Sequence, residues 1–306
     1  MTVQVIYNPR SGGGTDIAPF LDALRERGHQ TRTHNLEPGD DLKAILAGDD
    51  FDTVVAAGGD GTVSSVAAAV AGRNIPVLAY PAGTGNLVAL NLNLPSDAAD
   101  LAGVLHDGRT ALLDLGVISL AGPDGKREER NFILNAGVGF DAALIRTSEP
   151  LKGPLGFGAY IAAALANARP EVATFTLSLD GETREEEGIG VMLLNLPRVT
   201  LDLPLVNDGD PSDGKFDVIV LRASNAAQLV PDLARSALER LGLAKAAPNG
   251  RVDAYRGAKI TLTANKVLPA QFDGESVEGS LPLEASVRPR AVPFLVPAAR
   301  PANEAG

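Results

Sequence analysis

The sequence predicts an α/β domain built on a parallel sheet, followed by a β-rich domain. In the first third of the chain, short β-branched runs alternate with helical patterns, the order that builds a parallel sheet covered by helices. After Asp114, patterns of period two, which are typical of strands, replace this alternation. We therefore expect a domain boundary near residue 116, with domains over 1–116 and 117–288.

The elements of the first domain follow from its apolar spacing. Strands are expected at 3–7, 53–57 and 75–80, because each is a short buried run that ends at a glycine-rich turn. Three helices are expected. The first carries Ile17, Phe20, Leu21 and Leu24 on one face and ends at Gly28. The second spans 62–71, and the third begins near Leu87.

The second domain is expected to consist mainly of strands. The strand candidates are 131–135, 173–179, 189–194, 217–221 and 259–264, with hairpin turns at 123–125 and 180–182. Two helices are expected to interrupt them, near 156–168 and 226–241, and the tail 301–306 is expected to be disordered.

The composition excludes several classes of protein. The 306 residues hold 27 basic and 38 acidic side chains, and the net charge of −11 argues against a nucleic-acid partner. The absence of cysteine excludes disulfides and cysteine nucleophiles and suits a reducing compartment. Neither a signal-peptide pattern nor an apolar run of roughly 18 residues is present. We expect a cytoplasmic protein, peripheral to the membrane and without a transmembrane segment. Its oligomeric state does not follow from the sequence.

Three glycine-rich turns each follow an expected strand and precede an expected helix. They are NPRSGGG at 8–14, GGDGT at 58–62 and PAGTGN at 81–86. In an open α/β sheet such turns lie at the carboxyl ends of the strands, where glycine lets the backbone approach a phosphate closely. One such turn is as often a plain tight connection, but three in one domain favour phosphate binding. No Walker-type GxxxxGK[ST] motif is present.

Asp60 lies inside the second turn. A carboxylate beside phosphates would repel them unless Mg²⁺ lies between them or the carboxylate positions a proton or a water molecule. The plainer alternative is that Asp60 caps the helix that follows it. We favour the functional interpretation, because a capping residue does not explain the glycines on both sides.

These motifs together resemble a known family. NPxSGG, GGDGT and PxGTGN, followed by NAGVGFDA (135–142), DPSDGKFDV (210–218) and FDGE (272–275), resemble in order the diacylglycerol kinase catalytic domain of bacterial lipid kinases, a group that includes sphingosine kinases. The resemblance covers nearly the whole chain.

The resemblance implies a nucleotide-binding α/β domain of the NAD kinase and diacylglycerol kinase type, then a C-terminal β-sandwich. The last strand, near Pro289–Val296, would return to the first domain, so that 289–306 would belong with 1–116. ATP, as Mg-ATP, would give its γ-phosphoryl group to the hydroxyl of diacylglycerol or a related lipid in the cleft. The residues implied to contact ATP are Asn8, Pro9, Arg10, Ser11, Gly12, Gly58, Gly59, Asp60, Gly61, Thr62, Val63, Ser64 and Thr84.

The resemblance also implies the catalytic and metal-binding residues. Glu275 would accept the proton, with Asp273 beside it and Asp60 near Mg-ATP. A structural Mg²⁺ would be held by Asp210, Asp213 and the carbonyl of Lys215, and linked to the active site through polar groups that include Asp141. Taken alone, the spacing of Asp210 and Asp213 fits an acidic hairpin loop better.

The chain departs from the family pattern at three places. Ser64 and Ser65 stand where the family commonly has Asn-Glu, Leu36 stands where a Thr is often seen, and LVALN at 87–91 lacks the charged side chain that many relatives carry. These departures bear on nucleotide contacts and on the choice of acceptor.

Two other functions stay open. An NAD kinase shares the GGDGT turn, although PAGTGN argues against it, and a non-catalytic lipid-binding or nucleotide-binding protein could keep the same fold. The basic stretch 233–266 could face anionic lipid, but a solvated face is the more ordinary explanation. Likewise Tyr160, Ile161 and Leu165 could line an acyl-chain groove, or simply form core.

Overall fold

The computed structural model describes residues 1–48, 50–121, 126–139, 171–198, 209–223, 252–273, 275–277 and 280–298. The chain divides into two compact units, Met1–Leu113 with Arg290–Gly306, and Asp114–Pro289. Several expectations lie outside the described residues: the turn 123–125, Asp141, the helices 156–168 and 226–241, the part 233–251 of the basic stretch, and the tail 301–306.

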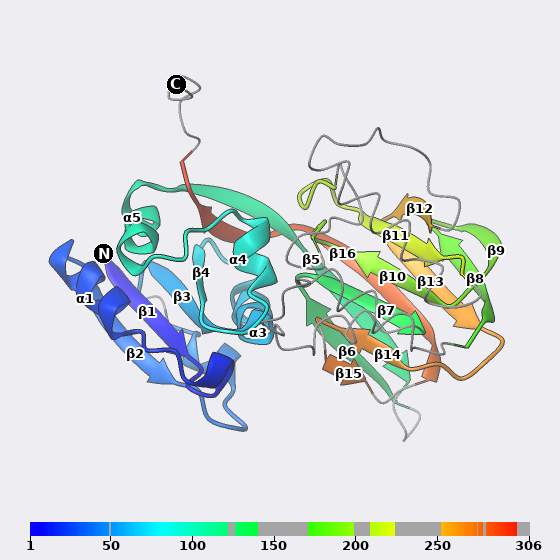
Figure 1. Cartoon of the computed structure of the whole chain (residues 1–306), viewed down its shortest axis with the longest axis horizontal. Helices are drawn as coiled ribbons and strands as arrows, with labels where there is room; N and C mark the ends of the chain where they lie inside the picture. Colours follow the sequence, from blue (N-terminus) through cyan, green and yellow to red (C-terminus); the bar gives the residue numbers. More distant parts are fainter. Residues whose placement is uncertain are drawn as a thin grey trace, which may run out of the picture. The chain divides into compact units, whose positions relative to one another are not determined.

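Unit 1 is built on a parallel sheet, as the sequence predicts. The strands β1 (Thr2–Tyr7), β2 (Gln30–Asn35), β3 (Thr53–Gly58) and β4 (Val77–Pro81) lie in the order β2-β1-β3-β4 (Figure 1). All three pairings are parallel. The end of the long strand β16 (Ser280–Val296) extends this sheet, because Phe294 pairs with Val77 of β4.

Helices cover both faces of this sheet. The helices α1 (Ala18–Glu26) and α5 (Ala98–Asp107) pack on each other (Figure 1). They share a core with the side chains of Val55 and Leu78. Alternate residues of a strand point to opposite faces, so Val54 and Ala56 face the other side. There α3 (Asp60–Val70) packs on β3 and β4.

The helix expected over 62–71 is α3, which begins two residues earlier, at Asp60, and ends at Val70. Gly59, in extended conformation, is its N-cap, and Asp60 is its first residue. Three short helices complete unit 1: η1 (Ser11–Gly13), α2 (Leu42–Ile45) and α4 (Leu87–Asn91).

Unit 2 is a sandwich of two mainly antiparallel sheets. One sheet holds β8 (Ala173–Leu179), β9 (Glu182–Gly188), β13 (Lys259–Ala264) and β16, joined by β5 (Arg109–Ala121) and β6 (Arg127–Phe132). The other runs β12 (Val252–Gly257), β11 (Phe216–Leu221), β10 (Gly190–Leu194), β7 (Asn135–Gly139), β14 (Ala270–Phe272) and β15 (Glu275–Val277) (Figure 1).

The core of unit 2 lies between these two sheets. Buried side chains from both sheets form one cluster, in which the rings of Phe132 and Phe216 stack with centroids 5.3 Å apart. The expected hairpin turn at 180–182 is confirmed, because Asp180 and Gly181 take positive φ between β8 and β9, as a tight two-residue turn requires.

One expected strand is wrong. The sequence predicts a continuous strand over 131–135, but β6 ends at Phe132 and β7 starts at Asn135. The carboxylate of Asp273 accepts the backbone N–H groups of Ile133 and Leu134, which therefore cannot take part in a strand ladder.

Candidate active site

The three glycine-rich turns meet at the carboxyl ends of β1, β3 and β4. Backbone hydrogen bonds join each turn to the next, from Asn8 N to Ala57 O at 2.8 Å and from Ala82 N to Gly58 O at 3.1 Å. The parallel sheet thus places all three turns along one edge of unit 1, as expected of a ligand-binding edge.

Side chains hold the first two turns together. The amide of Asn8 donates to the hydroxyl of Thr62 at 3.2 Å, and the hydroxyl of Ser11 accepts from the N–H of Gly59 at 3.2 Å. Asn8 also accepts the N–H of Arg10 at 3.1 Å. Hydrogen bonds of Asn8, Ser11 and Thr62 within the protein therefore hold the edge in shape.

Glycine is required where the turns approach one another. Gly12 has φ +57°, and a Cβ there would lie 2.2 Å from the carbonyl oxygen of Ala82. A Cβ on Gly83 would lie 2.4 Å from the Cα of Gly59. The three turns are thus in contact through their backbones.

Asp60 connects the second turn to the third. Its carboxylate is only 9% exposed, and Oδ1 accepts the N–H of Val88, in the first turn of α4, at 2.9 Å. The sequence alternative was a cap on the helix that follows Asp60; the N-cap of that helix is Gly59, and the bond from Val88 joins Asp60 to a different helix.

The residues expected to contact ATP separate into a rim and a support. Pro9, Arg10, Gly12 and Thr84 are exposed, while Asn8, Ser11, Gly59 and Gly61 are partly exposed. Gly58, Asp60, Thr62, Val63 and Ser64 are buried. The rim residues are therefore accessible to solvent, whereas the buried residues support the turns from inside the unit.

The structure shows the local contacts of two residues that depart from the family pattern. Ser65 donates its hydroxyl to the carbonyl of Gly61 at 2.8 Å, so this side chain is engaged with its own helix. Leu36 follows β2 and gives its N–H to the carbonyl of Tyr7 at 2.7 Å, a backbone contact that any residue except proline can make.

In unit 2, Asp273 is a buried anchor. Its two carboxylate oxygens accept the N–H groups of Ile133, Leu134 and Asn135 at 2.9, 2.9 and 3.0 Å, and the side chain is 5% exposed. It holds the turn between β6 and β7 against β14.

Glu275 differs from Asp273 in its surroundings. It is exposed and pairs across the β14–β15 hairpin with Phe272. Of the two carboxylates in FDGE, Glu275 is the one that solvent and a substrate can reach.

The residues expected to hold a structural Mg²⁺ lie in a turn before β11. Asp210 accepts the N–H and the hydroxyl of Ser212 at 2.9 and 2.6 Å, and Asp213 accepts the N–H of Lys215 at 2.9 Å. A second oxygen of Asp213 forms an ion pair with Arg256, which also contacts Asp217. The pKa of the Asp217 carboxyl is raised, chiefly by burial and also by the negative charge of Asp213, although the positive charge of Arg256 works in the opposite direction.

Two further polar residues of unit 2 were not found from the sequence. Asp114 is fully buried and accepts the N–H of Gly214 at 2.7 Å. Asn195 is 5% exposed and donates to the carbonyls of Asp114 and Ile133, both at 2.9 Å. No motif contains either residue. The one sequence signal for Asn195 is that a polar residue directly follows the apolar strand that ends at Leu194.

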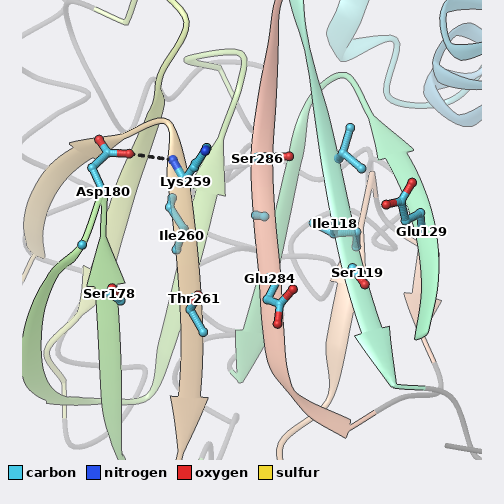
Figure 2. A pocket seen from close by; sticks show the side chains of 13 residues that line it. Ile118, Ser119, Glu129, Ser178, Asp180, Lys259, Ile260, Thr261, Glu284 and Ser286 are labelled. Carbon is cyan, nitrogen blue, oxygen red and sulfur yellow. Dashed lines mark hydrogen bonds between the residues drawn. The ribbon is translucent and has the colours of Figure 1, made fainter. Parts of the chain in front are cut away.

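Unit 2 also has a groove of about 490 Å³ away from these residues (Figure 2). Core residues Ile118 and Ile260 lie in it, and Glu129, Glu284 and Asp180 line it together with Lys259. None of the motif residues lines this groove, and its three carboxylates do not suit an acyl chain. Among the described residues, no helix is long and apolar enough to cross a membrane.

Comparisons with known proteins show which family this chain resembles. Residues 2–118 match the diacylglycerol kinase catalytic domain, and residues 135–296 match the YegS C-terminal NAD kinase beta sandwich-like domain. A diacylglycerol kinase of Staphylococcus haemolyticus is 30% identical over 74% of this chain and 69% of its own length. One of Mycobacterium tuberculosis is 29% identical over 74% of this chain and 75% of its own length.

Solved structures show the same fold. A diacylglycerol kinase of Bacillus anthracis superposes with a TM-score of 0.70 at 17% identity, over 96% of both chains. Yeast NADH kinase in complex with NADH superposes with a TM-score of 0.57 at 11% identity, over 98% of this chain and 84% of the other. With matched domains over both units and a relative at this level of identity, the chain belongs to the diacylglycerol kinase family.

Proposed function

We propose that this protein is an ATP-dependent lipid kinase that phosphorylates the hydroxyl of diacylglycerol or a related lipid. The observation that carries the proposal is the interlocked edge of three glycine-rich turns in unit 1, together with the accessible carboxylate of Glu275 in unit 2. Relatives named diacylglycerol kinase support the choice of acceptor.

The edge of unit 1 fits the phosphates of a nucleotide. Its glycines let the backbones of the three turns lie in contact, and the exposed Arg10 brings a fixed positive charge to the first turn. The buried charge of Asp60 lies at the junction of the second and third turns, where it would orient the Mg²⁺ that accompanies ATP as substrate.

In the transfer, the lipid hydroxyl oxygen forms a bond to the γ-phosphorus, and the bond from that phosphorus to the β–γ bridging oxygen breaks, so that ADP leaves. The hydroxyl proton goes to the carboxylate of Glu275. Asp273 keeps the turn between β6 and β7 in place next to the β14–β15 hairpin, and in this proposal it is a positioning residue. We place the protein at the membrane surface, where such a lipid is found, and in phospholipid metabolism.

A direct assay tests this function. The purified protein is incubated with Mg²⁺ and γ-labelled ATP and with diacylglycerol, sphingosine, phosphatidylglycerol, undecaprenol or NAD in separate reactions. We expect label in a lipid, with diacylglycerol labelled fastest. Label in NAD alone would establish an NAD kinase, and binding of ATP without any labelled product would establish the non-catalytic alternative.

A further inference from the structure

The turn that was expected to bind Mg²⁺ gathers several negative charges. We call residues 210–217 the acidic turn. It carries Asp210, Asp213 and Asp217, and the fully buried Asp114 contacts it through the N–H of Gly214 at 2.7 Å. Carboxylates held together and partly away from water repel one another and need a cation beside them.

Arg256 already supplies such a cation. Its guanidinium reaches two carboxylates at once, with one terminal nitrogen at Asp213 and Nε 3.0 Å from Asp217. Strand register fixes this contact, because Arg256 and Asp217 are directly paired residues of β12 and β11. The planar guanidinium presents several donors in a fixed geometry, which suits a bridge between two carboxylates.

Two of the carboxylate oxygens that Mg²⁺ would need already accept hydrogen bonds. Oδ1 of Asp210 accepts two hydrogen bonds from Ser212, and Oδ1 of Asp213 accepts the N–H of Lys215. Binding of Mg²⁺ by Asp213 would have to displace Arg256 from the other oxygen or place two cations side by side. The donor set therefore does not fit a resident Mg²⁺ in its present arrangement.

We propose that Arg256, and not a bound Mg²⁺, is the cation that bridges Asp213 and Asp217 in the acidic turn of this protein. The arginine does the structural work that the family resemblance assigns to a metal ion. This role of Arg256 does not depend on which acceptor the enzyme phosphorylates, because the turn lies within unit 2. Binding of Mg²⁺ and the melting temperature can both be measured without nucleotide or lipid.

The acidic turn is connected to other polar residues of unit 2. Asp114 contacts the acidic turn through Gly214, and the carbonyl of Asp114 accepts the amide of Asn195. The same amide group donates to Ile133, whose N–H donates to Asp273. Hydrogen bonds thus connect the acidic turn to Asp273, which precedes the strand that carries Glu275.

The test is a titration of Mg²⁺ into the nucleotide-free, chelator-treated full chain, followed by melting temperature and by calorimetry. For the wild-type protein we expect no saturable binding and no rise in melting temperature. For Arg256→Gln we expect a loss of roughly 2–4 °C, the size expected when both ion pairs of a half-exposed arginine are lost in a unit of this length. Part of that loss should return when Mg²⁺ is added to Arg256→Gln, and it should not return in Arg256→Gln with Asp213→Asn.

Arg222→Gln is the matched control. Arg222 also bridges two carboxylates, those of Glu186 and Asp253, and both arginine side chains are 45% exposed. This variant should lose stability without gaining any response to Mg²⁺. The proposal is overturned if wild-type protein binds one Mg²⁺ and Asp213→Asn abolishes that binding, or if Arg256→Gln melts at the wild-type temperature. If Arg256→Gln does not fold, the wild-type titration alone decides between arginine and metal.

Discussion

The carboxylate of Asp60 holds the N–H of Val88 at 2.9 Å, so the residue at the centre of GGDGT also fixes the start of the helix that follows PAGTGN. One side chain therefore combines a structural contact with the negative charge proposed to orient Mg-ATP. The two contributions can be separated because asparagine keeps an acceptor oxygen but loses the charge.

We expect Asp60→Asn to fold with a melting temperature close to that of the wild type and to lose nearly all phosphoryl transfer. Asp60→Ala should lose activity and also about 1 kcal/mol of stability, since the N–H of Val88 loses its acceptor. Thermal unfolding and the transfer assay on both variants check this. Turnover at the wild-type level in Asp60→Asn would remove the charge from the mechanism.

Glu275→Gln should lower kcat by roughly 10² to 10⁴ with little change in the KM for ATP, which is the usual effect of losing a general base. Its exposure predicts an unchanged melting temperature. Asp273→Asn should instead lose stability, because the amide turns an NH₂ group toward backbone donors. If Glu275→Gln kept full kcat while a stably folded Asp273→Asn lost it, Asp273 would be the base.

Gly12→Ala should weaken ATP binding and destabilise the edge of unit 1, because its Cβ would lie 2.2 Å from the carbonyl oxygen of Ala82. Gly28→Ala is the control: it has φ +79°, but a Cβ there has nothing within 4 Å. The control should cost only about 1 kcal/mol of backbone strain and leave the KM for ATP unchanged. Equal effects of both variants on this KM would show that contact between the turns is unimportant.

Asn195→Leu should cost roughly 2–4 kcal/mol of stability. The amide of Asn195 serves the buried carbonyls of Asp114 and Ile133, and an apolar side chain leaves both without their donor. Denaturant unfolding measures the loss. A change below about 0.5 kcal/mol would mean that water replaces the amide.

The stability of unit 1 should fall between pH 7 and pH 5. The pKa of His29 is lowered by burial and, less strongly, by the positive charges of the chain's amino group, His106 and Arg27. The unfolded chain therefore binds a proton more tightly than the folded one, so the contribution of neutral His29 is complete above the usual pKa of about 6.5 and declines below it.

His29 is 7% exposed, and within the described part of the chain neither of its ring nitrogens has a hydrogen-bond partner. His29→Leu should therefore reduce the slope of melting temperature against pH. His106→Gln, at an exposed position, should leave most of the slope in place. An unchanged slope in His29→Leu would assign the acid sensitivity to other groups.

The strands β1, β3 and β4 and their glycine-rich turns could be predicted because each is a short apolar run with a turn whose residues have few alternative conformations. The strand β2 was missed because QTRTHN lies at the edge of the sheet, mostly exposed, and has no apolar alternation. The strand β16 runs for 17 residues through several prolines that a local reading treats as breaks.

The sequence by itself determined the alternation of strand and helix, the glycine positions at the edge of unit 1 and the candidate carboxylates, since these depend on neighbours close in the chain. Only the tertiary structure decided which of these carboxylates are buried in hydrogen bonds and which are exposed. Asp273 ends β6 through contacts 140 residues away, and Arg256 reaches Asp213 across the register of β11 and β12. Such contacts follow from strand order, and local spacing holds no information about strand order.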